Sequence, residues 1–140
     1  MASIEKAIQM AVEAHAGQTD KAGEPYILHP LRLMLRFDTS EEMIAAVLHD
    51  VIEDTELTLE DLRAAGFSDD VLDAISCLTR NPDESYEVFA QRAKANPIAR
   101  RVKIADIEDN INVLRLAELS DRSLDRVRRY HGAWRMLTDG

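Results

Sequence analysis

Apolar residues recur every three to four positions along almost the whole chain, which is the spacing of one face of an α-helix. The first such segment runs from about Ser3 to His15, and a polar loop with two turn-forming residues follows it from Gly17 to Tyr26. No segment alternates apolar and polar residues for long enough to predict a strand. The pattern therefore predicts an all-α protein.

Local signals mark where the other helices begin and end. A second helix is expected to begin near His29-Pro30, because proline suits the first helical turn. Ser40, followed by two glutamates, predicts the N-cap of a third helix that runs to about Asp54. Further helices are predicted from Thr58 to Gly66, from Ser68 to about Arg80, and at about 84–95, 97–118 and 121–138, the last capped by Ser120. With no internal repeat or linker, we expect a single domain over residues 1–140.

The net charge of −9 argues against a general nucleic-acid binder, which needs clustered lysine and arginine. The charge is unevenly distributed, with 6 basic and 19 acidic residues in 1–90 but 11 basic and 7 acidic residues in 91–140. An acidic metal site and basic side chains could together hold a phosphorylated small molecule. Alternatively, the last helix simply has a basic face in contact with water.

Cysteine content and hydropathy indicate the compartment. Cys77 is the single cysteine, so neither an intrachain disulfide nor a cysteine-based metal site is expected. The chain has no apolar run of about 18 residues and no secretory leader pattern. These features predict a soluble, cytoplasmic protein without a membrane partner, and they leave its oligomeric state open.

The third predicted helix ends in the segment His49-Asp50-Val51-Ile52-Glu53-Asp54. On a continuous helix, residues four apart share a face, so His49 would lie over Glu53 and Asp50 over Asp54. The preceding residues, 44–48, are all apolar and are expected to be buried. An imidazole and a carboxylate at the end of a buried helix usually bind a cation or are paired.

Two other residues complete a possible ligand set. His29 stands in an apolar context at the start of the second helix, and Asp106 stands within a largely apolar helix. Together with His49 and Asp50 they offer imidazole nitrogens and carboxylate oxygens. This mixture suits a divalent transition metal such as Mn, Fe, Co, Ni or Zn better than Ca or Mg.

These candidates also have purely structural interpretations. Asp106 could form an ordinary buried ion pair with Lys103 or an arginine, and the histidine-aspartate dipeptide could cap a helix. The remaining histidines, His15 and His131, lack neighbouring ligand groups in the sequence and are interpreted as packing or surface residues.

Three segments resemble signatures of the HD-domain superfamily, and more closely the hydrolase domain of the RelA/SpoT family and its small stand-alone alarmone hydrolases. The segments are residues 14–18 with 21–30, residues 46–55, and residues 102–106 with Asn110. The resemblance spans about residues 5–115. It implies a compact multi-helix HD-domain bundle.

The resemblance also implies roles for individual residues. It assigns one Mn²⁺, or another divalent transition metal, to His29, His49, Asp50 and Asp106. It gives Glu53 and Asp54 the task of positioning and deprotonating the attacking water. It places substrate contacts at Lys21, Asn110, Arg126 and Tyr130. The implied reaction removes the 3′-pyrophosphate from (p)ppGpp and leaves GDP or GTP.

Around the substrate, the chain departs from the family pattern. Asp20 stands where the family usually has an arginine before the lysine of its first loop, and Ala16 replaces another arginine. In the third signature, the usual arginine, histidine and second arginine are replaced by Ile107, Asp109 and Asn112. The metal and water residues are intact, whereas the groups that hold base and phosphates are partly changed.

Three functions are therefore compatible with the sequence. The first is (p)ppGpp hydrolysis, and the second is hydrolysis of a related nucleotide phosphate such as an adenine alarmone, NADPH or a nucleoside monophosphate. The third is a metal-containing nucleotide sensor without turnover. The presence of Glu53 and Asp54 argues against the sensor, because binding alone needs no water-activating pair. All three predict a small nucleotide as the partner.

Overall fold

The computed structural model describes residues 2–139, which form helices and one isolated β-bridge between Thr19 and Pro25 but no strand. The elements are α1 (Ile4–Ala14), α2 (Leu28–Met34), α3 (Ser40–Leu48), α4 (Val51–Asp54), α5 (Leu59–Ala64), α6 (Asp69–Cys77), α7 (Tyr86–Lys94), α8 (Pro97–Asn110), the 3₁₀ helix η1 (Val113–Arg115) and α9 (Asp121–Thr138). The prediction of an all-α fold is confirmed.

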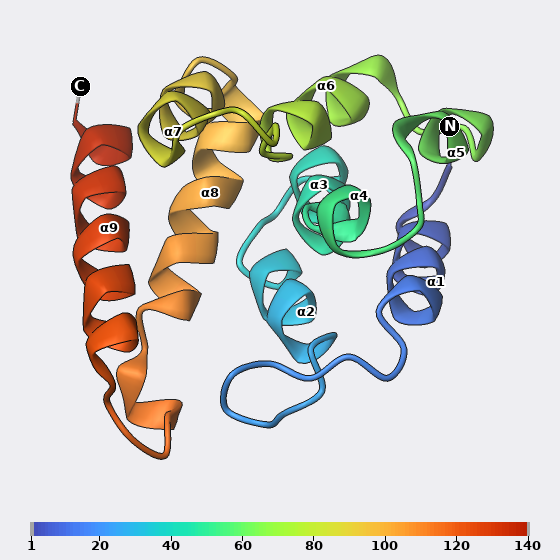
Figure 1. Ribbon diagram of the computed structural model, residues 1–140. Helices are drawn as coiled ribbons and strands as arrows, with labels where there is room; N and C mark the ends of the chain where they lie inside the picture. The colour runs from blue at the N-terminus through green and yellow to red at the C-terminus, as the bar shows by residue number, and fades with distance from the viewer. Residues whose placement is uncertain (1, 140) are drawn as a thin grey trace.

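Helix α3 lies at the centre of the molecule, where it packs against α1, α2, α6 and α8 (Figure 1). All its residues from Ile44 to Leu48 are buried, as their apolar sequence predicted. Burial of such side chains stabilises a fold by about 1.5–3 kcal/mol for each large one. The end of α3 is therefore held firmly, and the histidine that follows it is held with it.

A second, smaller core attaches α9 to α7 and α8, at the left of Figure 1. Its fully buried centre includes Ile107 of α8 and Leu137 of α9. Arg100 adds a hydrogen bond from Nε to the Leu137 carbonyl oxygen at 2.7 Å. This core fixes the helix that carries Arg126 and Tyr130, two of the predicted substrate contacts.

The prediction of one continuous third helix was wrong. The helix begins one residue earlier than expected, with Thr39 rather than Ser40 as its N-cap, and it is interrupted at His49-Asp50 before α4. At the break, the Ala46 carbonyl oxygen accepts hydrogen bonds from the backbone N–H and the ring Nδ1 of His49. The His49 side chain thus competes with backbone N–H groups for the Ala46 carbonyl oxygen, and the helix is interrupted there. Glu53 and Asp54, which follow the break, therefore do not lie on the same helical face as His49 and Asp50.

The end of α8 also differs from its prediction. The helix ends at Asn110, and only the short η1 follows within the stretch up to residue 118 that was predicted as helix. Arg115 folds back and donates from Nη2 to the Asp109 carbonyl oxygen at 3.0 Å, which satisfies an acceptor near the helix end. The predicted caps Thr58, Ser68 and Ser120 are confirmed.

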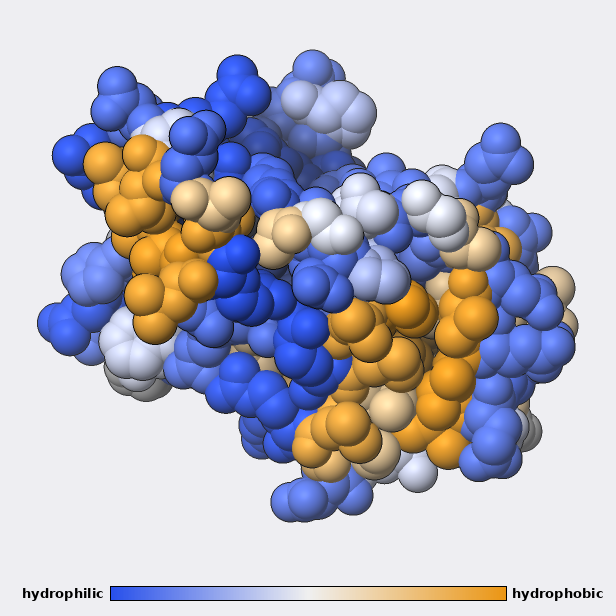
Figure 2. All heavy atoms as spheres, turned by 90° about the horizontal axis from the view of Figure 1, so that it is seen from below, coloured by the Kyte–Doolittle hydropathy of each residue, from blue (hydrophilic) through white to orange (hydrophobic). Residues whose placement is uncertain are grey.

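The surface seen from below is mostly hydrophilic, with two apolar areas (Figure 2). Large exposed apolar side chains of the molecule are Val12, Leu28, Leu35, Val88, Leu114, Leu119 and Leu124. Between Ala2 and Asp139, no helix has the length and apolar character required to cross a bilayer.

Glu84 lies just before α7 and connects the preceding turn to that helix through hydrogen bonds. Its side chain is 8% exposed, and its two carboxylate oxygens accept hydrogen bonds from Arg92 at 2.7 and 2.8 Å. One of them also accepts the Asn81 backbone N–H at 3.1 Å. The hydrogen bonds from Arg92 hold the pKa of Glu84 at about 2, well below its ordinary value.

We predict that Glu84→Gln lowers the melting temperature at pH 7 by a few degrees. Because the folded-state pKa is depressed, the carboxylate stabilises the fold above pH 4.5 and loses this effect as the pH falls towards about 2. The difference between parent and variant should therefore shrink between pH 7 and pH 3.5 in thermal unfolding. Glu118→Gln, at an exposed site, is the control. A difference that does not change with pH would contradict the assignment.

Candidate metal centre and adjoining cavity

The structure brings the four predicted metal ligands together. His29 comes from α2, His49 and Asp50 from the junction of α3 and α4, and Asp106 from α8. One ligand atom of each lies within 4.8 Å of all the others. Both histidines and Asp106 are buried, whereas Asp50 is partly exposed.

His49 has the geometry of a neutral metal ligand. Its Nδ1 lies 2.8 Å from the Ala46 carbonyl oxygen, which makes Nδ1 the hydrogen-bond donor and directs Nε2 towards the other ligands. Nε2 is buried and makes no hydrogen bond of normal geometry with the described residues. Carboxylate oxygens of Asp50 and Asp106 lie 2.9 and 3.4 Å from it. A divalent cation at this point would give the buried nitrogen a partner, so the residues fit the metal that the sequence predicts.

His29 has a similar arrangement. Its Nε2 lies 2.8 Å from Asp106 Oδ1, and its Nδ1 lies 2.6 Å from Asp109 Oδ2. Although burial by itself lowers the pKa of His29, the hydrogen bonds to these two carboxylates raise it above its ordinary value. A metal would therefore bind in place of a proton at this ring.

Asp106 is both a candidate ligand and a partner in an ion pair. Lys103 Nζ donates to Asp106 Oδ2 at 2.9 Å, so the structural interpretation considered for this residue also holds. Burial would raise the pKa of the Asp106 carboxyl, but Lys103 and the two histidines hold it well below its ordinary value. The carboxylate is thus ionised and available, with Oδ1 facing the histidines.

Two residues that adjoin the candidate ligands, Tyr26 and His15, were not predicted as part of the site. The Tyr26 hydroxyl donates to Asp50 Oδ2, and the His15 ring lies against the Tyr26 ring with centroids 4.8 Å apart. His15 is buried, as its packing role required, and its Nδ1 lies 2.8 Å from Gln18 Oε1. Gln18 Nε2 in turn donates to the Asp54 carbonyl oxygen at 3.0 Å. The only signal for these contacts was that the residues fall in the first signature.

Glu53 and Asp54 lie beside the four ligands rather than among them. Glu53 Oε1 accepts the Arg80 backbone N–H at 2.8 Å, which fixes its carboxylate. Partial burial, together with the negative charges of Asp50 and Glu53, raises the pKa of Asp54 to about 6. A carboxyl group with such a pKa can accept a proton near neutral pH more readily than an ordinary aspartate.

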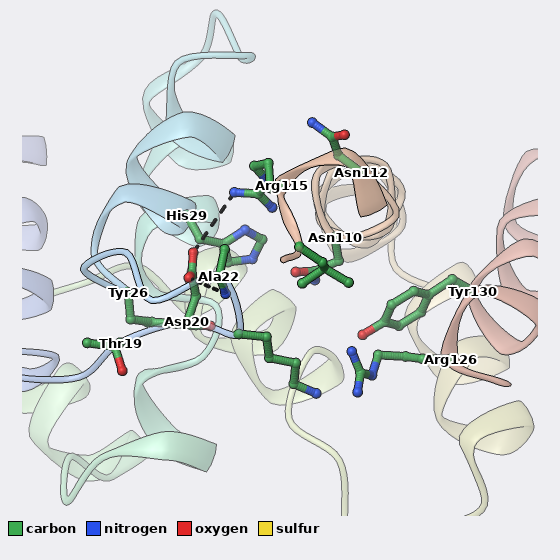
Figure 3. Close-up of a pocket in the computed structure, with 12 residues that line it drawn as sticks. Thr19, Asp20, Ala22, Tyr26, His29, Asn110, Asn112, Arg115, Arg126 and Tyr130 are labelled. Atoms are coloured by element: carbon green, nitrogen blue, oxygen red, sulfur yellow. Dashed lines mark hydrogen bonds and ion pairs between the residues drawn. The ribbon is translucent and has the colours of Figure 1, made fainter. Parts of the chain in front are cut away.

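A cavity of about 200 Å³ adjoins the ligand cluster, with His29 in its wall (Figure 3). The four predicted substrate contacts, Lys21, Asn110, Arg126 and Tyr130, all line this cavity. Figure 3 shows Arg126 and Tyr130 projecting from α9 towards the side formed by Asn110 and His29. Glu53 and Asp54 are not in its lining.

The cavity carries positive charge. Burial lowers the pKa of Lys21, and the charges of Arg126, Arg122 and Arg129 lower it further. A lysine whose pKa is lowered by neighbouring arginines lies in a region of positive potential, which attracts anions such as phosphate groups. The uneven charge of the sequence corresponds to this arrangement, because the basic last helix and the loop around Asp20 line the same cavity.

The residues that depart from the family pattern have defined places. Asp20 and Asn112 line the cavity, Ile107 belongs to the core under α9, and Ala16 is exposed. Asp20 Oδ1 accepts the backbone N–H groups of Ala22 and Glu24 at 2.9 and 3.0 Å. The aspartate that replaces the family arginine therefore shapes the loop itself.

Comparison with known proteins identifies relatives. The model of the HD domain family matches residues 7–122. The guanosine-3′,5′-bis(diphosphate) 3′-pyrophosphohydrolase of Aquifex aeolicus is 32% identical over 123 residues, covering 79% of this chain and 18% of that protein. The enzyme of the same name from Vibrio cholerae is 34% identical over 128 residues, covering 86% and 17%. The GTP pyrophosphokinase of Streptomyces coelicolor is 35% identical over 121 residues, covering 82% and 14%. The chain thus spans less than a fifth of the length of these relatives.

A solved structure has a similar fold. It is described as a metazoan ortholog of SpoT that hydrolyzes ppGpp, and it matches with a TM-score of 0.82 at 22% sequence identity. The match covers 100% of this chain and 87% of that one. The HD-domain bundle expected from the sequence is thereby confirmed as the fold.

We predict that Asp54→Asn raises the melting temperature of the metal-free protein at pH 7. The folded-state pKa of about 6 exceeds the ordinary value of 3.8, so folding disfavours the charged form at neutral pH. The gain should disappear as the pH falls from about 6 to below 3.8, where both states are protonated. Thermal unfolding at pH 7 and pH 3.5 measures it, with the exposed Asp73→Asn as control. A lower melting temperature of Asp54→Asn than of the parent at pH 7 would contradict the raised pKa of Asp54.

Proposed function

Because the chain belongs to the HD domain family, we propose that it is a metal-dependent phosphohydrolase that removes the 3′-pyrophosphate from (p)ppGpp. The observation that carries the proposal is the position of His29, which belongs both to the ligand cluster and to the wall of the cationic cavity. An anionic ligand in this cavity would have a phosphate group next to the metal. The names of the relatives support guanosine 3′,5′-bis(diphosphate) as that ligand.

The proposed metal ligands are His29, His49, Asp50 and Asp106. Two imidazoles and two carboxylates suit Mn²⁺, and other divalent transition metals are compatible with the same set. When bound, the cation would acidify a water molecule and neutralise charge on the phosphoryl group. Tyr26 would orient the carboxylate of Asp50.

Asp54 and Glu53 are the proposed acid–base pair. The water oxygen would bond to the phosphorus attached to the ribose 3′ oxygen, and the bond between that phosphorus and the 3′ oxygen would break. Asp54, with its raised pKa, would take a proton from the water, and this proton would pass to the 3′ oxygen as it leaves, giving the 3′-hydroxyl of the product. Glu53, held by the Arg80 backbone, would keep negative charge beside it. The products are pyrophosphate and GDP, or GTP when the substrate is pppGpp.

The cavity residues would hold the nucleotide. Lys21 and Arg126 supply positive charge for phosphates, and Tyr130 supplies an aromatic face for the base. Asn110 donates from Nδ2 to Asp106 Oδ1 at 2.9 Å, so a contact between Asn110 and the nucleotide would also touch the metal ligand. In this proposal the activity resides in one domain, residues 1–140, of a cytoplasmic protein.

A related nucleotide phosphate is the second candidate substrate, and the observation that favours it is the carboxylate of Asp20 in the cavity lining. A negative charge there weakens binding of a highly anionic ligand. Incubation of Mn²⁺-loaded protein with ppGpp, its adenine counterpart, NADPH and nucleoside monophosphates tests both candidates. Pyrophosphate and GDP as the preferred products support the first, and turnover of none of these nucleotides would leave a binding role.

We predict that the parent protein binds about one divalent metal ion per chain and that His49→Ala abolishes both metal binding and turnover. Removal of the imidazole takes away a buried nitrogen, Nε2, that makes no hydrogen bond of normal geometry with residues 2–139. Elemental analysis after loading and desalting measures the metal. His131→Ala, which removes an exposed histidine, should retain the full complement. A full complement in His49→Ala would refute the ligand assignment.

Asp54→Asn and Glu53→Gln are predicted to retain metal and fold while lowering turnover by roughly a hundredfold or more, the usual scale for loss of a general base. Steady-state kinetics on the preferred nucleotide, at saturating Mn²⁺, measures the effect. Glu56→Gln, an exposed carboxylate two residues further on, is the matched control and should remain near parental turnover. Turnover within threefold of the parent would give the substituted residue a structural role instead.

A further inference from the structure

Asp109 makes a contact that the proposed function does not explain by itself. Its Oδ2 lies 2.6 Å from His29 Nδ1, the ring nitrogen that faces away from the ligand cluster. On the other side of the same ring, Nε2 faces Asp106. Asp109 is 17% exposed at its side chain and therefore lies at the inner edge of the site. We propose that Asp109 is a positioning residue that fixes the ring of His29 for metal binding.

The two nitrogens of an imidazole are not equivalent. A carboxylate that accepts the Nδ1 proton leaves the lone pair on Nε2, which is the atom that faces the ligand cluster. The same hydrogen bond opposes rotation of the ring and makes Nε2 a stronger donor to a cation. His49 receives equivalent support from a backbone carbonyl oxygen, whereas His29 depends on this side chain.

Asp109 is itself held in place by two arginines. Arg32 donates from Nε to Oδ1 at 2.9 Å and from Nη2 to Oδ2 at 2.8 Å, a bidentate pair. Arg115 Nη2 lies 3.7 Å from Oδ2 and donates to the Asp109 carbonyl oxygen at 3.0 Å. The planar guanidinium of Arg32 fixes both oxygens, so the carboxylate cannot rotate away from His29 without breaking an ion pair.

The arrangement also links the metal ligand to the nucleotide loop. Arg115 Nη1 lies 4.0 Å from Asp20 Oδ2 (Figure 3). Asp20 in turn accepts backbone hydrogen bonds within the loop that carries Lys21. A single chain of charged groups thus runs from the loop through Arg115 and Asp109 to His29. Asp109 acts on the metal through His29, and it is not itself a ligand.

This inference rests on the proposed metal site, and titration of metal-free protein with Mn²⁺ tests the two separately. Free Mn²⁺ is followed by electron paramagnetic resonance. We expect Asp109→Ala to weaken Mn²⁺ binding by about ten- to a hundredfold, the usual effect of losing such a partner. Asp109→Asn keeps an oxygen that can accept the Nδ1 proton, and its loss should be smaller. Circular dichroism of the metal-free proteins confirms that each is folded.

Two controls separate positioning from a general loss of charge. Glu108→Gln removes a neighbouring carboxylate that pairs with Arg36 but does not touch a ligand, and its Mn²⁺ affinity should stay within about twofold of the parent. Arg32→Gln removes the partner of Asp109 but leaves the contact with His29, and it should weaken binding by less than Asp109→Ala. Visible spectra of the Co²⁺ forms should change in Asp109→Ala and not in Glu108→Gln.

The outcomes are distinguishable. If the parent does not bind Mn²⁺, the proposed metal site fails. If the parent binds and Asp109→Ala binds within twofold of it, or if Arg32→Gln loses as much affinity as Asp109→Ala, the positioning role is overturned. Should Asp109→Ala not fold, Asp109→Asn decides the matter, because threefold or greater weakening is expected and parental affinity would refute the role.

Discussion

The buried carboxylate of Asp106 is the group around which the site is organised. Burial of an ionised carboxylate costs several kcal/mol unless other groups compensate its charge. Here Oδ1 faces the Nε2 atoms of His29 and His49 and accepts from Asn110, while Oδ2 accepts from Lys103. These partners come from α2, the end of α3, and α8, which pack against one another. The arrangement that packs these helices is therefore the same one that brings the compensating groups to Asp106.

Lys103 supplies the nearest positive charge that compensates Asp106. The ammonium group of Lys103 is buried next to Asp106 and lies 4.9 Å from the centre of the Phe89 ring and 5.6 Å from that of Tyr86. Cation–π contacts of this kind replace part of the lost hydration of the amine. Without metal, the histidines can carry protons that pair with Asp50 and Asp106, and a metal ion would release those protons. Groups of the protein itself therefore compensate the charge of Asp106.

Sequence alone predicted those parts of the fold that depend on local interactions. Apolar spacing predicted the helices, and the caps Thr58, Ser68 and Ser120 were found because each bonds a backbone N–H three residues away. The break after Leu48 was missed because a side chain takes over a backbone acceptor there. The end of α8 was missed because Arg115 folds back onto it.

In the candidate site too, features with a local sequence pattern could be predicted, whereas contacts between distant residues could not. Its four candidate ligands could be brought together from the sequence because each falls in a signature with a recognisable context. The groups that orient them could not, since no local pattern connects His29 with Asp109, which lies 80 positions further along the chain. Asp109 was noted only as a departure from the family pattern. Its contact with His29 becomes visible only in the structure.

Attachment of α9 through its own small core has a consequence for the layout of the site. The ligand cluster is built from α2, the junction of α3 and α4, and α8, whereas Arg126 and Tyr130 reach the cavity from a helix that packs on α7 and α8. Substitutions on the cavity face of α9 therefore replace none of the candidate ligands and touch none of the side chains that orient them. The part of the chain that lines the cavity from α9 is thus separate from the part that builds the candidate metal centre.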